Sequence, residues 1–293
     1  MSWRTLVVTR CAKLESKLNY LVIRENGSET KVFLDEISTL ILESTQISIT
    51  CALLEELISR KVNIVFCDSK RNPVSQLCSL YGSHDDSSRI RSQILWDRET
   101  KDIFWGEIIK EKILNQARFL HKLKHEDSAK MLLDYRNQVE PGDTTNREGP
   151  AAKVYFNALW GASFSRTQDC FVNAALNYGY QILLSAFSRE IVASGYLTQL
   201  GIFHDNMFNH FNLGCDLMEP FRPLVDSVVY TLPKSDELTK ADKIALVDAL
   251  NISVVIDSSR QYLINAIKIY CSGIFNAIES GDLSKIKFFA YEF

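Results

Sequence analysis

The chain has 293 residues, of which 46% are apolar and 24% are charged, as in an ordinary soluble protein. No apolar run is long enough to span a bilayer, and the first residues lack a secretory signal, so we expect a cytoplasmic protein with no membrane partner. The formal net charge of −3 excludes a broad electrostatic attraction for nucleic acid, so any DNA binding requires a local basic surface, a metal or a partner.

The first part of the chain predicts a small β-rich domain. Several segments are rich in β-branched and aromatic residues and are bounded by turn-forming residues, as strands are. They are residues 3–10, 20–25, 30–36, 38–44, 62–68 and 74–81. Residues 48–61 instead have the helical period, with Leu53 and Leu57 on one face. Strands with one helix packed on them predict a sandwich-like unit.

The rest of the chain predicts helices. The polar stretch from Tyr81 to Ser88 indicates a domain boundary, which we place between residues 82 and 83. Beyond it, apolar residues recur with the helical period in residues 89–124 (one or two helices), 129–139, 147–161, 169–195, 223–232, 240–250 and 258–280. The predicted fold class is therefore α+β, with a small β-rich domain (1–82) and a larger all-α domain (83–293). Within the second domain, residues 169–195 are nearly all apolar and predict a central buried helix.

Residues 201–226 place several ionisable groups among Phe, Leu and Met residues. Burying a charge is costly unless it is paired or bound to a metal, so the stretch is either a set of helix ends and turns or a site. A single histidine such as His204 is more often a core residue than a ligand. Its spacing to His210 excludes the paired histidines of an HExxH zinc site.

Two acids near this stretch have both a structural and a functional interpretation. Asp216 and Glu219 have the spacing of a helix capping box, and Glu148, just before an apolar helix, is favoured by the helix dipole. Glu148 also follows a loop, where site residues are common. If Glu148, His204 and Glu219 converge, two carboxylates and one imidazole suit Mg²⁺ or Mn²⁺ better than Zn²⁺. Phosphodiester chemistry would then follow, but the spacing leaves both interpretations open.

At these residues the chain resembles the CRISPR-associated integrase family, which inserts new spacers into a repeat array. The segments that carry the resemblance are NREGPAAKVYF (146–156), GIFHDNMFN (201–209) and DLMEPFRPLVD (216–226). Three more segments resemble the type II branch, which operates beside an RNA-guided effector nuclease. They are WRTLVVTRCAKL (3–14), VFCDSKRNP (65–73) and EKILNQARFL (111–120).

The resemblance implies an N-terminal sandwich-like dimerisation domain and a helical catalytic domain. It also implies a homodimer, with two such dimers flanking a dimer of a small ferredoxin-like partner (a 4:2 complex). Further partners that it implies are other type II acquisition proteins and the RNA-guided effector nuclease. The metal triad that it implies is Glu148, His204 and Glu219, with Mg²⁺ or Mn²⁺ bound. The chain departs from the family pattern at Cys215, where members often have an acid, which leaves Asp216 as a group that supports a ligand.

The implied reaction joins DNA to DNA. A 3′-hydroxyl of a double-stranded fragment attacks a phosphate of the repeat array, and the 3′-hydroxyl of the target strand leaves. Lys153 and Arg222 are the first candidates for phosphate contacts, followed by Arg147 and Arg166, and the alternative for them is a solvated helix face. Two other functions stay open. One is a metal-dependent nuclease that only hydrolyses DNA, and the other is a non-catalytic subunit that presents DNA, which the near-neutral charge favours.

Overall fold

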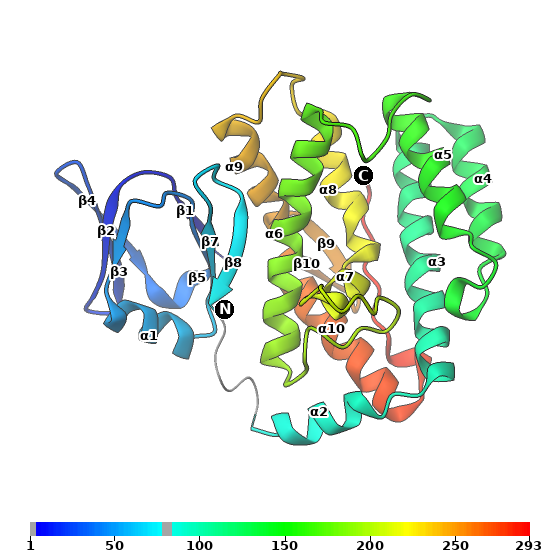
Figure 1. Ribbon diagram of the computed structural model, residues 1–293, viewed down its shortest axis with the longest axis horizontal. Coiled ribbons are helices and arrows are strands. Elements are labelled where there is room, and N and C mark those ends of the chain that lie inside the picture. The colour runs from blue at the N-terminus through cyan, green and yellow to red at the C-terminus, as the bar shows by residue number, and fades with distance from the viewer. Residues whose placement is uncertain (1–3, 78–83) are drawn as a thin grey trace. The chain divides into compact units, whose positions relative to one another are not determined.

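The computed structural model describes residues 4–77 and 84–293, which belong to two compact units, Met1–His84 and Asp85–Phe293 (Figure 1). The first unit is rich in strands and the second is mostly helical, so the predicted α+β fold class is confirmed. The predicted boundary between residues 82 and 83 lies outside the described residues.

The N-terminal unit contains two four-stranded sheets and helix α1 (Cys51–Ser59). One sheet has the order β1-β5-β7-β8, and the other has the order β4-β3-β2-β6. The strands are β1 (Arg4–Val8), β2 (Ala12–Lys17), β3 (Tyr20–Glu25), β4 (Ser28–Phe33), β5 (Ile37–Leu42), β6 (Ile47–Ile49), β7 (Asn63–Cys67) and β8 (Pro73–Leu77). Leu14 and Leu21 of one sheet share a buried core with Leu40 and Ile64 of the other and with Leu53 of α1. This shared core is the sandwich-like arrangement that the sequence predicts.

The sequence reading missed β2, because its segment AKLESK contains three charged residues. Its side chains nevertheless alternate, since Ala12 and Leu14 are buried while Lys13 between them is exposed. Strand β6 was also missed, because three residues are too few to show a period.

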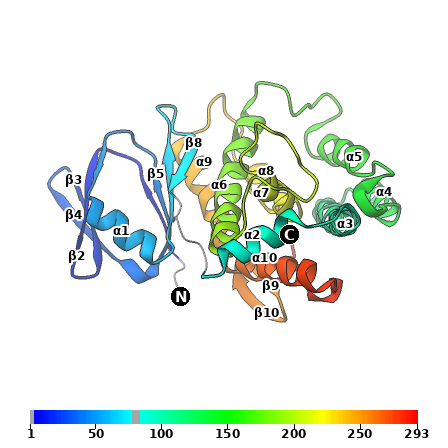
Figure 2. The same ribbon diagram turned by 60° about the horizontal axis from the view of Figure 1, so that its bottom comes forward.

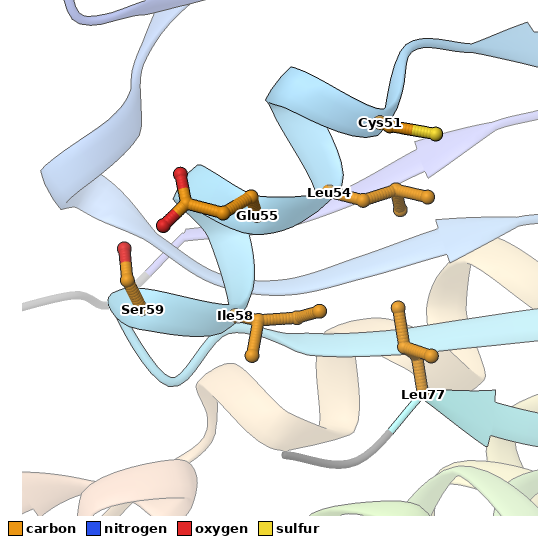
Figure 3. Close-up of a pocket in the computed structure, with 6 residues that line it drawn as sticks. All are labelled: Cys51, Leu54, Glu55, Ile58, Ser59 and Leu77. Atoms are coloured by element: carbon orange, nitrogen blue, oxygen red, sulfur yellow. The ribbon is translucent and has the colours of Figure 1, made fainter. Parts of the chain in front are cut away.

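An open pocket of about 380 Å³ lies on the outer face of α1 (Figure 3). Leu54 and Ile58 of α1 face Leu77 of β8 across it, and among the described residues its lining contains one carboxylate, Glu55, and the thiol of Cys51. A single carboxylate beside apolar side chains offers no cluster for phosphate or metal chemistry, so the candidate site lies elsewhere.

The C-terminal unit is built from helices, most of which lie in the predicted segments. They are α2 (Asp86–Ile94), α3 (Arg98–Lys122), α4 (Glu126–Asn137), α5 (Glu148–Trp160), α6 (Phe171–Ala193), α7 (Asn212–Leu217), α8 (Arg222–Thr231), α9 (Lys240–Asp248) and α10 (Leu263–Ser280). Helix α7 was not predicted. Short 3₁₀ turns join them, of which η3 (Glu219–Phe221) matters for the site. Among the described residues, no helix has the length and apolar character that crossing a membrane requires.

Helix α6 is the centre of this unit, as predicted. It packs against α7, α8, α9 and α10, while α3 packs against α4, α5, α8 and η3 (Figures 1 and 2). Because α3 touches both α5 and η3, side chains from three distant parts of the sequence meet on it.

The predicted all-α domain also contains a β-hairpin, β9 (Ser253–Ile256) and β10 (Ser259–Tyr262). The predicted helix 258–280 therefore begins only at Leu263. Asp257 and Ser258 form the turn with φ of 49° and 60°, the backbone that a two-residue hairpin needs. The β-branched run before the turn, ISVVI, was the signal for the strand.

Candidate active site

The two predicted acids, Glu148 and Glu219, lie on either side of one lysine. Lys112 Nζ of α3 is 2.5 Å from Glu148 Oε1 and 2.6 Å from Glu219 Oε2. The Lys112 side chain is 8% exposed and that of Glu219 is 3% exposed, whereas 29% of Glu148 is open to solvent. The fold thus brings both carboxylates to one buried positive charge, with Glu148 at the open side.

Glu148 is held in place by the loop before α5. Asp143 accepts hydrogen bonds from the backbone N–H groups of Arg147 (2.8 Å) and Glu148 (3.0 Å), so it satisfies donors at the start of the helix. Asp143 and Asn146 both have positive φ, which turns the chain sharply just before the helix. Glu148 is therefore a first-turn acid, as the helix-dipole interpretation expects, and it also contacts Lys112.

The 3₁₀ turn that carries Glu219 is anchored by a buried aromatic cluster. The ring of Phe221, two residues later in η3, contacts the rings of Phe187, Tyr270 and Phe289. The carbonyl of Pro220 also accepts a hydrogen bond of 3.0 Å from Asn115 Nδ2 of α3. Since Asn115 and Lys112 lie on the same helix, η3 is fixed to the element that carries its ionic partner.

The capping-box interpretation of Asp216 and Glu219 is wrong. Asp216 lies inside α7, and its carboxylate accepts hydrogen bonds from the backbone N–H groups of Ile202 (2.6 Å), Phe203 (2.9 Å) and His204 (3.1 Å). Glu219 forms no capping bond. The backbone N–H groups of residues 202–204 need an acceptor, and the buried carboxylate of Asp216 serves them instead of capping a helix.

His204 is oriented by the same aspartate. Its Nδ1 is 2.5 Å from Asp216 Oδ1, and its ring lies edge-on to Trp105, which stacks on Phe203 at 4.4 Å between centroids. With Nδ1 engaged, Nε2 is the nitrogen left for a ligand, and it has no hydrogen-bond partner within residues 4–77 and 84–293. The imidazole is thus held in one orientation with 40% of its side chain exposed.

His204 lies close enough to both acids to feel their charges. The hydrogen bond to Asp216 raises the pKa of His204, although partial burial opposes the rise, and the charges of Glu219 and Glu148 raise that pKa further. The charges of the two acids therefore reach the His204 ring. The direct contacts join only Glu148 and Glu219, through Lys112, so convergence of all three side chains on one ion stays a prediction.

Glu219 is ionised despite its burial. Burial alone would raise the pKa of Glu219, but the charges of Arg222 and Lys112 outweigh it and hold that pKa below its usual value. Arg222 Nη2 is 3.0 Å from Glu219 Oε1, and its guanidinium lies 4.9 Å from the ring centre of Tyr180. Arg222 is thus packed in the site, and its interpretation as part of a solvated helix face is wrong.

The other basic candidates have different surroundings. Arg166 donates hydrogen bonds to the side chains of Asn173 and Asn177, which hold it against α6. Arg147 is half-buried at the residue before α5. Lys153 is exposed on α5 and forms no ion pair with any described residue.

The donor groups fit a hard divalent cation. Across the residues that the structure describes, no group of three His, Cys, Asp or Glu side chains is arranged to hold a metal as it stands, since Lys112 lies between the two acids. Glu219 Oε2 is nonetheless buried, and its close partner is the Lys112 ammonium at 2.6 Å. A buried, charged carboxylate, a second carboxylate and an open imidazole nitrogen form the kind of set that binds Mg²⁺ or Mn²⁺.

Sequence reasoning missed Lys112. It lies four residues after Ile108 and seven before Phe119, both of which are buried on the same face of α3. A lysine on the apolar face of a helix requires a buried partner, so its position was a usable signal.

A second buried carboxylate lies under the site. Asp226 of α8 accepts hydrogen bonds from Tyr155 Oη (3.0 Å) and Tyr180 Oη (2.5 Å). Burial raises the pKa of Asp226 to about 6, although the hydrogen bonds from both tyrosines and the charge of Arg222 oppose the rise. This carboxylate therefore takes up a proton near neutral pH.

Replacing Asp226 with asparagine should flatten the pH dependence of stability. The folded pKa of about 6 exceeds the unfolded value of 3.8, so the folded state binds more protons between these pH values. Stability of the parent protein should fall as pH rises through this window, and Asp226→Asn should lack that loss. Urea unfolding from pH 4 to pH 7 should show the variant gaining up to about 3 kcal/mol relative to the parent. Parallel profiles for the two proteins would contradict the assignment.

Known proteins resemble this chain along most of its length. The family model described as CRISPR associated protein Cas1 matches residues 6–266. A CRISPR-associated endonuclease Cas1 from Neisseria meningitidis serogroup C (strain 8013) is 35% identical over 261 residues, covering 88% of this chain and 86% of that protein.

Solved structures share the fold. A casposase bound to integration product has a TM-score of 0.77 at 18% identity and covers 96% of this chain and 91% of its own. A Cas6-RT-Cas1–Cas2 complex has a TM-score of 0.72 at 19% identity and covers 97% of this chain, which spans 36% of that longer chain. At these identities the two structures establish a common architecture of both units.

Proposed function

The chain belongs to the Cas1 family of CRISPR-associated proteins, and from this premise we propose that it is a metal-dependent DNA integrase of spacer acquisition. It would join the 3′-hydroxyl ends of a short double-stranded DNA to phosphates of a CRISPR repeat array by transesterification. The observation that carries the proposal is the meeting of Glu148 and Glu219 at one buried charge.

The related proteins support the reaction class and the partner. The Neisseria relative is named an endonuclease, and the casposase of the same fold is described with its integration product. The complex of the same fold contains Cas2 together with Cas1, which supports a small Cas2-type partner for this chain. We extend this to a cytoplasmic homodimer, two of which flank the partner dimer, in a type II system with its other acquisition proteins.

Glu148, Glu219 and Nε2 of His204 would hold Mg²⁺ or Mn²⁺. When bound, such an ion polarises the target phosphate and eases deprotonation of the attacking hydroxyl. Asp216 keeps the His204 ring in one orientation through Nδ1. Arg222 keeps Glu219 charged, because an ion pair at 3.0 Å favours the carboxylate over the acid.

The chain's own cations would position the DNA. Lys153 lies five residues after Glu148 on α5 and is exposed, so its ammonium would contact the backbone of the incoming strand. Arg222, and then Arg147 and Arg166, are further proposed phosphate contacts. In the reaction, the fragment 3′-oxygen forms a bond to phosphorus, the bond from phosphorus to the target 3′-oxygen breaks, and that oxygen takes a proton. Holding the reactants in line supplies much of the rate.

Alanine substitutions test the proposal. Glu148→Ala and His204→Ala are each expected to abolish the joining of a short duplex with free 3′-hydroxyl ends to a supercoiled repeat plasmid. Glu107→Ala serves as the matched control, because Glu107 is a half-exposed acid on α3 whose partner is Lys110 at 2.8 Å, away from the cluster. Joined product is scored by gel electrophoresis.

The same assay separates the other functions. A nuclease that only hydrolyses DNA would nick the plasmid without forming joined product. A non-catalytic subunit would still support joining in the assembled complex after Glu148, His204 and Glu219 are all replaced by alanine. Either result would overturn the integrase proposal.

A further inference from the structure

Lys112 occupies the position between the two carboxylates where a bound cation is expected. Its Nζ makes close contacts to Glu148 and Glu219 at the same time, and the side chain is 8% exposed. A buried ammonium between two acids is typical of a fixed counter-charge rather than a surface ion pair. The lysine comes from α3, which carries neither acid, so the contact joins three separate elements.

The charges of the cluster balance without a metal. Glu148 and Glu219 contribute two negative charges, and Lys112 and Arg222 contribute two positive charges. A divalent cation added to this set would leave two positive charges in excess. Like charges repel strongly where water is excluded, so the ion and the Lys112 ammonium cannot share the same carboxylate oxygens.

We propose that Lys112 is an internal counter-cation of the site, which holds Glu148 and Glu219 in place until a divalent ion displaces it. This inference rests on the proposed function, because it concerns the same two acids. The flexible four-carbon stem of lysine allows the ammonium to withdraw without movement of α3. Lys112 is thus a positioning residue that keeps the acids together in the metal-free protein and lowers the affinity of the site for the ion.

The affinity of the full-length protein for Mn²⁺ tests the competition directly. After treatment with EDTA and its removal, Mn²⁺ is titrated and the free ion is followed by electron paramagnetic resonance. Lys112→Met is expected to bind Mn²⁺ about tenfold more tightly than the parent, because the ion no longer displaces an ammonium. Lys110→Met is the matched control, since Lys110 lies on the same helix but pairs with Glu107, and its affinity should equal that of the parent. Equal or weaker binding by Lys112→Met overturns the proposal.

Thermal unfolding gives a readout that does not depend on activity. In EDTA, Lys112→Met should unfold at a lower temperature than the parent, because two buried acids lose their counter-charge. Mn²⁺ should raise the unfolding temperature more in Lys112→Met than in the parent. Lys112→Gln is the second variant, for use if Lys112→Met does not fold. Glutamine keeps a hydrogen-bond donor for the acids but carries no charge, so Mn²⁺ should raise its unfolding temperature more than that of the parent. An Mn²⁺ shift as small as that of the parent contradicts the role of Lys112.

Glu219→Gln distinguishes failure of this inference from failure of the proposed function. Glu219→Gln should abolish Mn²⁺ binding, both as a single substitution and in combination with Lys112→Met. If Mn²⁺ binding depends on Glu219 but not on Lys112, the counter-cation role is wrong and the metal site stands. If Mn²⁺ binding does not depend on Glu219, the metal site itself is wrong, and this inference fails with it.

Discussion

Glu219→Gln is expected to lower the rate of strand transfer about a thousandfold, the effect of losing several kcal/mol of charge stabilisation at the reacting phosphate. The amide has nearly the same shape as the carboxylate but no charge to ligate a cation. Glu219 Oε2 is buried 2.6 Å from the Lys112 ammonium, so its charge serves an ionic contact rather than the local backbone. The measurement is the rate of joined-product formation at saturating Mn²⁺.

The same variant should also lose stability, by about 2–3 kcal/mol in urea unfolding, because Lys112 and Arg222 lose a charged partner. Loss of a helix cap alone would cost about 1 kcal/mol, which is less than this expected value. Glu107→Gln, on the solvent side of α3, should change neither the rate nor the stability. Normal transfer by Glu219→Gln would contradict the metal site, and parental stability of the variant would contradict the burial argument.

The helical half of the fold could be predicted because its period is long and repeated. Residues 169–195 show the apolar pattern over many turns, and α6 follows it closely. The hairpin at 253–262 was missed because its strands have four residues each, too few to outweigh the helical pattern after them. The β-branched residues of the first strand indicated a strand, but the stronger helical pattern that follows led to a predicted helix that begins too early.

The residues of the candidate site could be named from the sequence, but their positions relative to one another could not. The resemblance placed Glu148, His204 and Glu219, yet no spacing rule connects residues that lie on α5, a loop and η3. Their meeting depends on α3, which packs against both α5 and η3 and supplies Lys112. Tertiary packing decides this, and a local pattern cannot contain it.

Asp216 shows that a local sequence pattern can also predict the wrong hydrogen-bond partners. Its sequence context indicates a capping box, because Asp and Glu three residues apart are common at helix starts. Its actual partners are the backbone N–H groups of residues 202–204, which lie 12 to 14 residues earlier in the sequence. Gly201 permits this approach, since an added Cβ there would lie 2.8 Å from Asp216 Oδ2 and 2.2 Å from the His204 carbonyl oxygen.

Asp216→Ala should therefore have the largest effect on the loop that carries His204. The substitution leaves three backbone N–H groups and His204 Nδ1 without their acceptor in a buried setting. Each unpaired buried donor costs about 1–3 kcal/mol, and partial access of water to the loop should limit the total to about 3 kcal/mol. Urea unfolding measures this loss, and hydrogen exchange should show faster exchange at residues 202–204 than in the parent.

Strand transfer by Asp216→Ala should fall at least about a hundredfold, because the His204 ring loses the contact that fixes its orientation. His204→Ala separates the two roles of the aspartate. It keeps all three backbone hydrogen bonds to Asp216, so it should abolish transfer while changing the unfolding free energy by less than about 1 kcal/mol. If Asp216→Ala retained parental stability and exchange, the carboxylate would not be what holds the loop, and the orientation of His204 would need another source. Asp216 contacts this loop through three backbone N–H groups and through the His204 ring. Comparing the two variants therefore assigns the loss of folding stability to the backbone hydrogen bonds and the loss of strand transfer to the ring.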